Sequence, residues 1–487
     1  MDQRFEKRTI NVLLADHLDK HKVVWLHSGN DFVDLLYSFL TMPLGTIVRL
    51  LENHGRLRQT VTLGCLNNLY KSVVDMNIDN FRTEACKQML VYPKSVKESQ
   101  CKMLKINIDV DTEATKHFMC PMYLQRKSCR EFFSNFNTSR CSCGNLMKKE
   151  ISSPEGEEFA SRLGGSCDYD GVFVHGDGNL AFILSDDLKI ENFSRELFRK
   201  RVKDLGCVNG LDEIGEGEAE LGFREAMTFL RSLFASDTPL TTTFYPFNSS
   251  TYPSKRAFKP SSSPCDSVLG QVLSLTVYLS KQDKRKVMYA KCGEGFIDLL
   301  CTFLVLPLEY ICEISASDDG CDDGLGCIGN LFRSFKGLSC GEITIPWYYR
   351  CRKNLLGVPV QTLPSFYSCF EDHAFSGDRE DRLKKVRPMD PKTEISDQSR
   401  SSGGFVKSNK KFLVSDDLII TPLNTDLTVR DLKRFKISFD EVNIEEITIG
   451  RTEAINLLKA SFVTSSALSD GLSDLLTKKL EAKEDNS

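Results

Sequence analysis

The stretch GNDFVDLLYSFLTMPL at residues 29–44 occurs a second time, little changed, as GEGFIDLLCTFLVLPL at residues 293–308. Its large apolar residues fall three and four positions apart, on one face of a helix: Phe32, Leu35, Leu36, Phe39 and Leu40. The second copy keeps this stripe as Phe296, Leu299, Leu300, Phe303 and Leu304. Pro43 and Pro307 cannot continue a helix from within, so each is expected in the first turn of a new one. The stretch therefore predicts two successive helices, the first with a buried apolar stripe.

Three further blocks repeat in the same order along the chain. LGCLNNLYKS returns as LGCIGNLFRS, and FILSDDL returns as FLVSDDL. REAMTFLRSLFASDTPLT is answered by TEAINLLKASFVTSSALS. Four blocks in one order predict that a whole folding unit of about 220 to 240 residues is present twice.

Short apolar runs ahead of the repeated helices predict strands. TINVLLA and KVVWLH precede the first copy, LSLTVYL and KVMYA precede the second, and a charged turn separates each pair. Later, GVFVHGDGNLAFILSDDL has two apolar runs around a Gly-Asp-Gly turn, which predicts a β-hairpin. The last repeated block predicts a C-terminal helix. We therefore predict an α+β fold of two homologous repeat units, each opening strand, strand, helix, helix.

Shifts in composition place the boundaries of these units. The predicted segments are a first repeat unit at residues 1–246 with a cysteine-rich element at 117–147, a Ser- and Pro-rich linker at 247–267, a second repeat unit at 268–477 with a mobile loop at 377–404, and a charged tail at 478–487. The tail is expected to fray, as charged chain ends commonly do.

Charge and hydropathy limit the partners and the compartment. The formal net charge is -4, which offers no basic face to nucleic acid. No apolar run reaches the roughly 18 to 20 residues that cross a bilayer. The charged start, MDQRFEKRTI, is not followed by an apolar signal segment. We expect a soluble protein of the cytoplasm or the nucleus, not secreted and not bound to a membrane, with reduced cysteines and a protein partner; nucleic acid is not expected, and the oligomeric state is left open.

Several of these motifs together resemble a known plant family. They are DFVDLLYSFLTMPLGTIVRLL, LGCLNNLYKSV, FRTEACKQMLVYPK, RCSCGNLM, GGFVKSNKKFLVSDDL and EAINLLKASF, and they span nearly the whole chain. The set is similar to the family catalogued as domain of unknown function 674. The resemblance implies a plant protein with the duplicated layout. It supplies no catalytic residues, because the family's label assigns no activity.

Four cysteines of the first unit give the clearest chemical signal: Cys120, Cys129, Cys141 and Cys143. Four thiolates can hold a zinc ion in a tetrahedron, and Gly144 lets the backbone turn after the last of them. In a reducing compartment such a group favours a metal over disulfides. The spacing Cys-x8-Cys-x11-Cys-x-Cys is looser than two Cys-x2-Cys knuckles, so four unlinked buried thiols are the alternative. His117, three residues before Cys120, is a further candidate ligand that could replace one of the cysteines.

Other motifs point away from cofactors. The second unit has Cys340, Cys351 and Cys369 but no Cys-x-Cys pair, so one structural zinc ion per chain is expected. GLGCIGN at residues 324–330 matches the letters of a dinucleotide fingerprint, but it follows an acidic loop rather than a buried strand. We therefore expect no bound nucleotide.

Acidic residues repeat in both units without forming a typical acid–base site. Asp186–Asp187 and its repeat Asp416–Asp417 lie at strand ends, where adjacent side chains point to opposite faces. A turn that ends the hairpin and caps a following helix is expected there. Asp34 and Asp298 each interrupt an apolar stretch, and a rim position or a hydrogen bond to a neighbouring turn is expected for them.

No group of residues typical of an enzyme recurs in both units. The seven histidines occupy no equivalent positions in the two copies, and no Gly-x-Ser-x-Gly elbow or Walker A loop is present. The leading hypothesis is a non-catalytic interaction or scaffold protein. An enzyme of unknown class, with its site in the cleft between the two units, is the alternative.

Overall fold

The structure of the chain is a computed structural model. It describes residues 8–17, 22–53, 61–95, 97–109, 115–151, 171–174, 181–204, 214–245, 258, 260, 272–315, 325–338, 366–370, 382–389, 392, 404–423 and 442–484. Helices and strands are mixed along these residues, so the predicted α+β class is confirmed.

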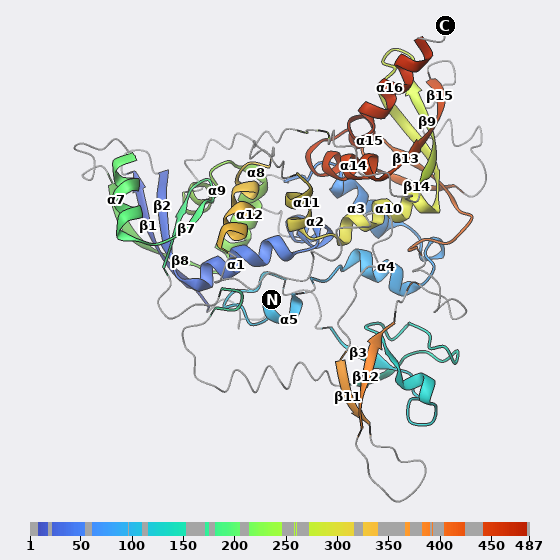
Figure 1. The fold of residues 1–487 in the computed structure, drawn as a ribbon, viewed down its shortest axis with the longest axis horizontal. Helices are drawn as coiled ribbons and strands as arrows, with labels where there is room; N and C mark the ends of the chain where they lie inside the picture. Colours follow the sequence, from blue (N-terminus) through green and yellow to red (C-terminus); the bar gives the residue numbers. More distant parts are fainter. Residues whose placement is uncertain are drawn as a thin grey trace, which may run out of the picture.

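Two five-stranded antiparallel sheets lie at opposite ends of the molecule (Figure 1). In spatial order the first contains β7 (Ile190–Asn192), β6 (Phe182–Ser185), β2 (Lys22–Ser28), β1 (Ile10–His17) and β8 (Ile214–Leu221). The second contains β14 (Ile420–Leu423), β13 (Lys411–Ser415), β10 (Val287–Gly293), β9 (Leu273–Ser280) and β15 (Val442–Ile449). The two sheets therefore share one strand order, with each long first strand at an inner position.

Helices fill the space between the two sheets (Figure 1). Two follow each opening strand pair: α1 (Asn30–Thr41) and α2 (Leu44–Asn53), then α10 (Glu294–Val305) and α11 (Leu308–Ser315). The others are α3 (Leu66–Asp75), η1 (Ile78–Asn80), α4 (Glu84–Val91), α5 (Glu98–Cys101), α7 (Arg195–Asp204), α8 (Phe223–Ala235), α9 (Pro239–Phe244), α12 (Cys327–Leu338), α14 (Arg451–Val463), α15 (Ala467–Gly471) and α16 (Ser473–Glu484). The chain thus opens strand, strand, helix, helix, and this order returns from Leu273.

The predicted apolar stripes are buried. Leu36 on α1 and Leu300 on α10 are both 0% exposed. Yet burial on α1 is not confined to this stripe, because every residue from Phe32 to Thr41 is buried. The periodicity underestimates the burial because α1 packs on the first sheet and also against α11 from the other half of the chain.

The two helix–helix connections pair with each other. The amide of Leu44 donates to the carbonyl of Leu306 at 2.9 Å. The amide of Leu308 donates back to the carbonyl of Met42 at 3.0 Å. Pro43 therefore lies opposite Pro307 in an isolated antiparallel bridge. Helices α2 and α11 begin at the residue after each proline, which fits the predicted role of proline in starting a helix.

The third helix of each half packs on the sheet of the other half. α3 lies against β14, and α12 lies against β7. The Asn68 side-chain amide donates to the Asp417 carbonyl at 3.0 Å. At the other end of the molecule, Asn330 donates to the Asp187 carbonyl at 2.8 Å. The two halves are therefore interlocked, and one apolar core runs through both.

A repeated glycine lets the third helix of each half pack against the other half. Gly64 and Gly326, which precede α3 and α12, have φ of 50° and 58°, a left-handed conformation that favours glycine. A Cβ on Gly64 would lie 2.5 Å from the Ser461 carbonyl oxygen. The next amide, that of Cys65, donates to the same oxygen at 2.8 Å. The glycine of the LGC motif thus lets α3 begin in contact with α14.

The hairpins are not placed as the sequence predicts. β6 lies between β2 and β7, so its hairpin partner is β7, joined through the Ser-Asp-Asp-Leu turn. β13 and β14 form the same hairpin in the second sheet. Residues 171–174, predicted to pair with β6, instead bind the Asp34 carboxylate. The Gly-Asp-Gly turn at residues 176–178 lies outside the described residues.

The predicted boundary segments are only partly described. Of the linker at 247–267, the structure describes residues 258 and 260 alone, so the domain boundaries stay a prediction. Part of the segment expected to be a mobile loop, 377–404, forms β12 (Arg382–Pro388). α16 continues to Glu484, so the first part of the expected tail is helical.

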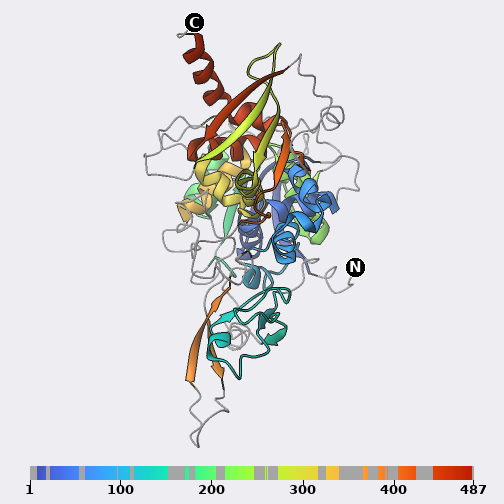
Figure 2. The same cartoon turned by 90° about the vertical axis from the view of Figure 1, so that its right-hand side faces the viewer.

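A cysteine-rich element projects from the helical body, below it in Figures 1 and 2. It contains β3 (His117–Met119), η2 (Lys127–Arg130), β4 (Phe132–Phe133) and β5 (Lys149–Ile151), joined by β11 (Phe366–Phe370) and β12. β3 pairs with β5, and β12 runs parallel to β4. This element contains the four predicted metal ligands.

Candidate metal centre

The four cysteines come from three separate turns of this element. Cys120 directly follows β3, and Cys129 lies in η2. Cys141 and Cys143 lie at the tip of a narrow hairpin, where the Cys141 amide donates to the Asn145 carbonyl at 2.9 Å. Gly144 has φ of 88°, so the sharp turn after Cys143 needs a residue without Cβ, as the sequence predicts.

The fold brings the four sulfur atoms together. All four Sγ atoms lie within 4.8 Å of one another, and those of Cys120 and Cys143 are 3.4 Å apart. Sulfur atoms on a zinc tetrahedron, with Zn–S bonds of about 2.3 Å, are roughly 3.8 Å apart. The cluster is therefore of the size that one metal ion would fill. The donor set itself, four thiols and no carboxylate, suits a thiophilic metal.

Burial differs among the four thiols. Cys120, Cys129 and Cys141 are buried, whereas Cys143 is half-buried. Burial raises the pKa of the Cys120 thiol to about 11 and raises that of Cys129 still further. A hydrogen bond from the Asn145 backbone holds the pKa of Cys143 down to about 7. A bound cation would favour the thiolate form of all four, because the metal ligand is S⁻ rather than SH.

Nearby amides point at the sulfur atoms. The Met122 amide lies 3.4 Å from the Cys120 Sγ, and the Asn145 side-chain amide lies 3.5 Å from the Cys143 Sγ. Such donors partly neutralise thiolate charge and orient the ligands. Met147 and Met389 are buried against the cluster and exclude water from its inner side. The site is therefore closed on its inner side and open to solvent at Cys143.

Residues from the second half of the chain complete the surroundings of the four cysteines. The spacing of residues in the sequence does not reveal this contact. The Met389 amide donates to the Phe133 carbonyl at 2.8 Å, and the Arg387 amide donates to the Glu131 carbonyl at 2.9 Å. The Arg387 guanidinium also lies 3.1 Å from the Glu131 carboxylate and 5.0 Å from the Phe132 ring centre. β12 thus ties a segment near residue 390 to ligands near residue 130.

His117 is not part of this cluster, and the side chains of the three cysteines singled out in the second unit are not described. The His117 ring packs against Phe133 at a centroid distance of 5.3 Å, and burial lowers the pKa of His117. His117 is not in the described group of potential ligands. Cys340 and Cys351 lie outside the described residues, as does the side chain of Cys369 in β11. The prediction that the second half lacks a site therefore stays a prediction.

Asp34 and Asp298 make the predicted hydrogen bonds to neighbouring turns. Asp34 accepts the amides of residues 172, 173 and 174 at 2.5, 2.9 and 2.9 Å. Asp298 accepts those of Phe405 and Val406 at 2.6 and 3.0 Å. Burial raises the pKa of both carboxyls to about 6, even though these bonds favour the charged form. Their contacts are with backbone, so they hold segments in place.

The repeated Asp pairs also cap helices, although not the next ones in sequence. Asp186 accepts the Thr241 amide at 3.0 Å and the Thr241 hydroxyl at 2.6 Å, at the start of α9. Asp416 makes the equivalent bonds to the amide and hydroxyl of Ser469 in α15, both at 2.8 Å. The aspartates therefore cap helices that come about fifty residues later in each half, not the segment that directly follows the turn as the sequence predicts.

Comparison with known proteins places the chain in a family. The sequence matches the family described as Protein of unknown function (DUF674) over residues 6–452. The chain belongs to the DUF674 family. The resemblance inferred from its motifs is therefore confirmed. No curated protein and no solved structure matches the chain.

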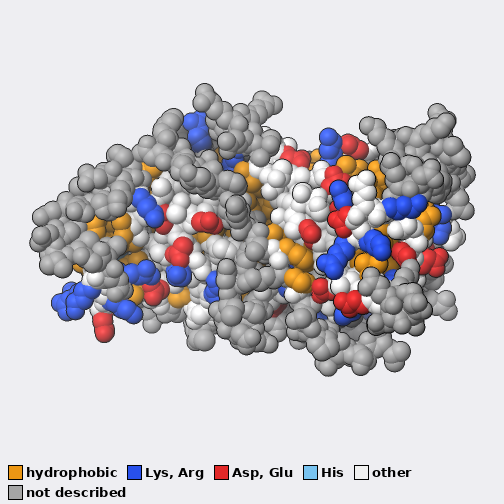
Figure 3. All heavy atoms as spheres, turned by 90° about the horizontal axis from the view of Figure 1, so that it is seen from above, with side chains coloured by type: hydrophobic (Ala, Val, Ile, Leu, Met, Phe, Trp, Pro, Cys, Tyr) orange, Lys and Arg blue, Asp and Glu red, His pale blue; other side chains and the backbone are white. Residues whose placement is uncertain are grey.

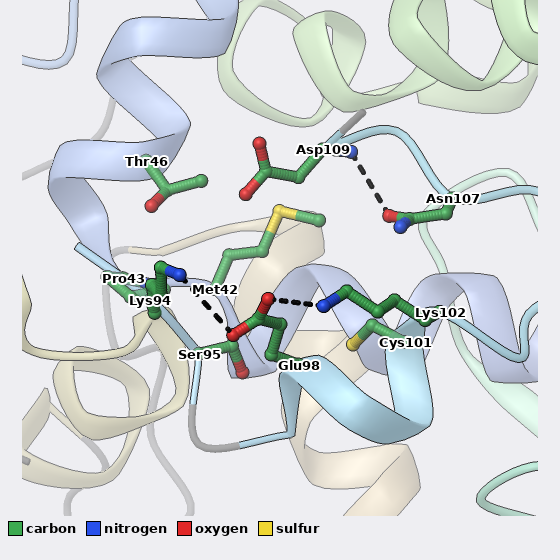
Figure 4. A pocket seen from close by; sticks show the side chains of 10 residues that line it. All are labelled: Met42, Pro43, Thr46, Lys94, Ser95, Glu98, Cys101, Lys102, Asn107 and Asp109. Atoms are coloured by element: carbon green, nitrogen blue, oxygen red, sulfur yellow. Dashed lines mark hydrogen bonds and ion pairs between the residues drawn. The ribbon is translucent and has the colours of Figure 1, made fainter. Parts of the chain in front are cut away.

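A small cavity of this DUF674 chain lies next to the connection between α1 and α2 (Figure 4). Its lining residues are Met42, Pro43, Thr46, Lys94, Ser95, Glu98, Cys101, Lys102, Asn107 and Asp109. The Glu98 carboxylate lies 2.6 Å from Lys102 Nζ and 4.0 Å from Lys94 Nζ. Burial raises the pKa of Cys101 to about 12, which keeps this thiol protonated at neutral pH. With about 30 Å³ of space, the cavity is large enough for only one or two water molecules.

The surface of the DUF674 chain carries both signs of charge. On the face shown in Figure 3, basic and acidic side chains are interspersed over the described residues. Among the residues that the structure describes, no helix has the length and apolar character that crossing a bilayer requires.

Proposed function

We propose that Cys120, Cys129, Cys141 and Cys143 hold one structural zinc ion, and that the protein is a non-catalytic interaction or scaffold protein of the cytoplasm or nucleus. The observation that supports this best is the gathering of four Sγ atoms within 4.8 Å of one another, three of them on buried residues. Catalytic zinc sites typically have three protein ligands and an open position for water. Four thiolates leave no such position, so the ion would act as a crosslink.

The choice of zinc rests on the donor atoms. Tetrahedral sites of four thiolates suit zinc or iron–sulfur chemistry. A single ion with no redox role fits a cluster whose sulfur atoms are about one tetrahedral edge apart. Metal analysis separates the two options, because an iron-containing site would give iron and colour.

The element around the cysteines has little else to hold it. Its own strands β3, β4 and β5 are two or three residues long, and its apolar contacts form two small clusters. Structural zinc binding supplies roughly 10–16 kcal/mol in small zinc-dependent folds. A zinc ion here would fix the three turns and, through Met389, the β12 strand.

The same element is proposed as the contact surface for a protein partner. It projects from the body (Figures 1 and 2) and leaves Leu124 42% exposed. Residues 115–151 contain seven Lys or Arg and two Glu, whereas the whole chain has a net charge of -4. The cations Arg126, Lys127, Lys148 and Lys149 are exposed. A partner with an acidic surface would complement this region.

Metal content tests the zinc proposal. Full-length protein, purified without added metal, is expected to contain one zinc per chain by elemental mass spectrometry. Cys141→Ser and Cys143→Ser should each lose most of the zinc, because three thiolates bind it more weakly. Cys101→Ser, a buried cysteine outside the cluster, is the matched control and should keep it. A wild-type chain without metal, or serine variants that retain it, would overturn the proposal.

A second experiment tests the contact surface. Proteins bound to the wild-type chain in extract are compared with those bound to a variant carrying Lys148→Glu and Lys149→Glu. A variant with Lys284→Glu and Arg285→Glu changes two exposed cations on the β9–β10 turn instead and serves as the control. Loss of the same protein only from the first variant supports the surface. Equal recovery on all three, or retention of nucleic acid rather than protein, contradicts it.

A further inference from the structure

The described cysteines differ sharply in their access to solvent. Ten of the eleven are buried, and only Cys143 is half-exposed. Its sulfur lies 3.4 Å from the sulfur of Cys120. Oxidants attack accessible thiolates first, so the cluster has one point of entry.

We propose that Cys143 and Cys120 are a site of thiol oxidation, at which a peroxide forms a disulfide and releases the bound metal ion. This inference rests on the proposed zinc site and adds a mode of regulation to it. A disulfide bond is about 2.05 Å long, so the two sulfur atoms must approach each other by roughly 1.4 Å. A turn that contains Gly144 can make a movement of this size.

The chemistry needs one peroxide and no further reactant. The Cys143 thiolate attacks one oxygen of hydrogen peroxide, the O–O bond breaks, and hydroxide leaves, which gives a sulfenic acid. The Cys120 thiolate then attacks that sulfur, the S–O bond breaks, and a second hydroxide leaves as the disulfide forms. Two protons from solvent convert the hydroxides to water. The two thiols together lose two electrons, and the peroxide gains them.

Loss of the metal follows from the count of ligands. After the disulfide forms, only Cys129 and Cys141 remain as thiolates, which is too few for a closed tetrahedral site. Met389 packs on this cluster, so β12 would lose part of its support. Oxidation would therefore loosen the contact between the cysteine-rich element and the second half of the chain.

The test uses the full-length chain loaded with zinc. Hydrogen peroxide is added, zinc release is followed with a coloured chelator, and disulfides are mapped by mass spectrometry. We expect one zinc per chain to be released, with a Cys120–Cys143 disulfide, while the fully buried Cys301 stays a thiol. Cys143→His removes the accessible sulfur but offers a nitrogen ligand, so its zinc should be released about tenfold more slowly. Cys101→Ser should release zinc at the wild-type rate.

The outcomes separate this inference from the proposed function. A wild-type chain that binds no zinc refutes the zinc site itself. A chain that binds zinc but keeps it in peroxide, or forms a disulfide that omits Cys143, overturns only the oxidation proposal. The disulfide map of the wild-type chain gives this answer even where Cys143→His fails to bind metal. Equal release rates from wild type and a zinc-loaded Cys143→His also overturn it.

Discussion

The interlocked core and the cysteine-rich element are stabilised in different ways. In the core, α1 and α10 are buried among side chains from both halves, and the stabilisation is spread over many apolar residues. In the element, short strands surround one thiol cluster and a few apolar side chains. The core should therefore lose only part of its stability when one side chain is truncated, whereas the cysteine-rich element depends on a few groups. Four predictions test this difference, from the largest expected effect to the smallest.

Metal removal should unfold the element and leave the core folded. Zinc binding of roughly 10 kcal/mol is far more than the short strands replace. With a strong chelator, hydrogen exchange should become fast in residues 117–151 and 382–389. Exchange in α1 and α10 should stay slow, because their burial does not depend on the cluster.

The buffer without chelator and the Cys141→Ser variant are the controls for this experiment. The variant should resemble the chelated wild-type protein. Unfolding of the whole chain on chelation would show that the two regions are not independent.

Truncation of one large core side chain should weaken the whole body. Phe303 on α10 is 0% exposed, and Phe303→Ala should lower the free energy of unfolding by about 3–5 kcal/mol. Phe39→Ala, at the equivalent place on α1, should cost a similar amount, because both rings belong to one core. Urea denaturation followed by circular dichroism measures both.

Ile444→Ala is the control for these two variants, because Ile444 is 50% exposed and should change stability by about 0.5 kcal/mol or less. If Phe39→Ala and Phe303→Ala each split unfolding into two transitions, then the halves are separate folding units.

The carboxyl groups that hold segments onto α1 and α10 should give a pH dependence. The pKa of Asp298 is about 6 in the folded chain and 3.8 as its ordinary value, so the folded state binds more protons between these pH values. Stability from this group is present below about pH 4 and is lost as pH rises through about 6. Asp298→Asn should remove this loss, so wild type should fall by about 1–3 kcal/mol relative to the variant between pH 4 and pH 6.

Asp34→Asn should show the same difference, because Asp34 is bonded to backbone amides in the same way. Asp283→Asn, on the exposed β9–β10 turn, is the control and should follow the wild-type curve. A wild-type curve that rises with pH relative to both buried variants would contradict the assignment.

The hydrogen bonds that α3 and α12 make to the opposite half of the chain should contribute least to stability. Asn68→Ala and Asn330→Ala each remove the two hydrogen bonds that the side-chain amide donates across the halves, and each should cost about 1–2 kcal/mol. These bonds lie at opposite ends of the molecule, so the double variant should show the sum of the two costs. Denaturation midpoints measure the effect, with the exposed Asn137→Ala as control. An unchanged midpoint in both single variants would show that apolar packing alone fixes the exchange.

Much of the local structure could be read from the sequence. The helical spacing from Phe32 to Leu40, the proline after each helix and the turn at Gly144 correspond to what the structure shows. The four cysteines predicted as ligands do lie together in the structure, as their close spacing and the glycine turn suggested, and their role as metal ligands stays a prediction. The predicted hairpin partner of β6 was wrong, because two apolar runs near each other in the sequence can pair together or with other strands.

The sequence by itself therefore determined the opening strand pairs, the helices that follow them and the grouping of the four cysteines, since these depend on spacings within a few tens of residues. Only the tertiary structure decided that α3 and α12 pack on the opposite sheets and that β12 closes the metal centre. The physical reason is that the two halves carry nearly the same motifs. An Asn in the LGC helix could bond the Ser-Asp-Asp turn of either half, and the choice depends on how the whole chain packs around the paired prolines.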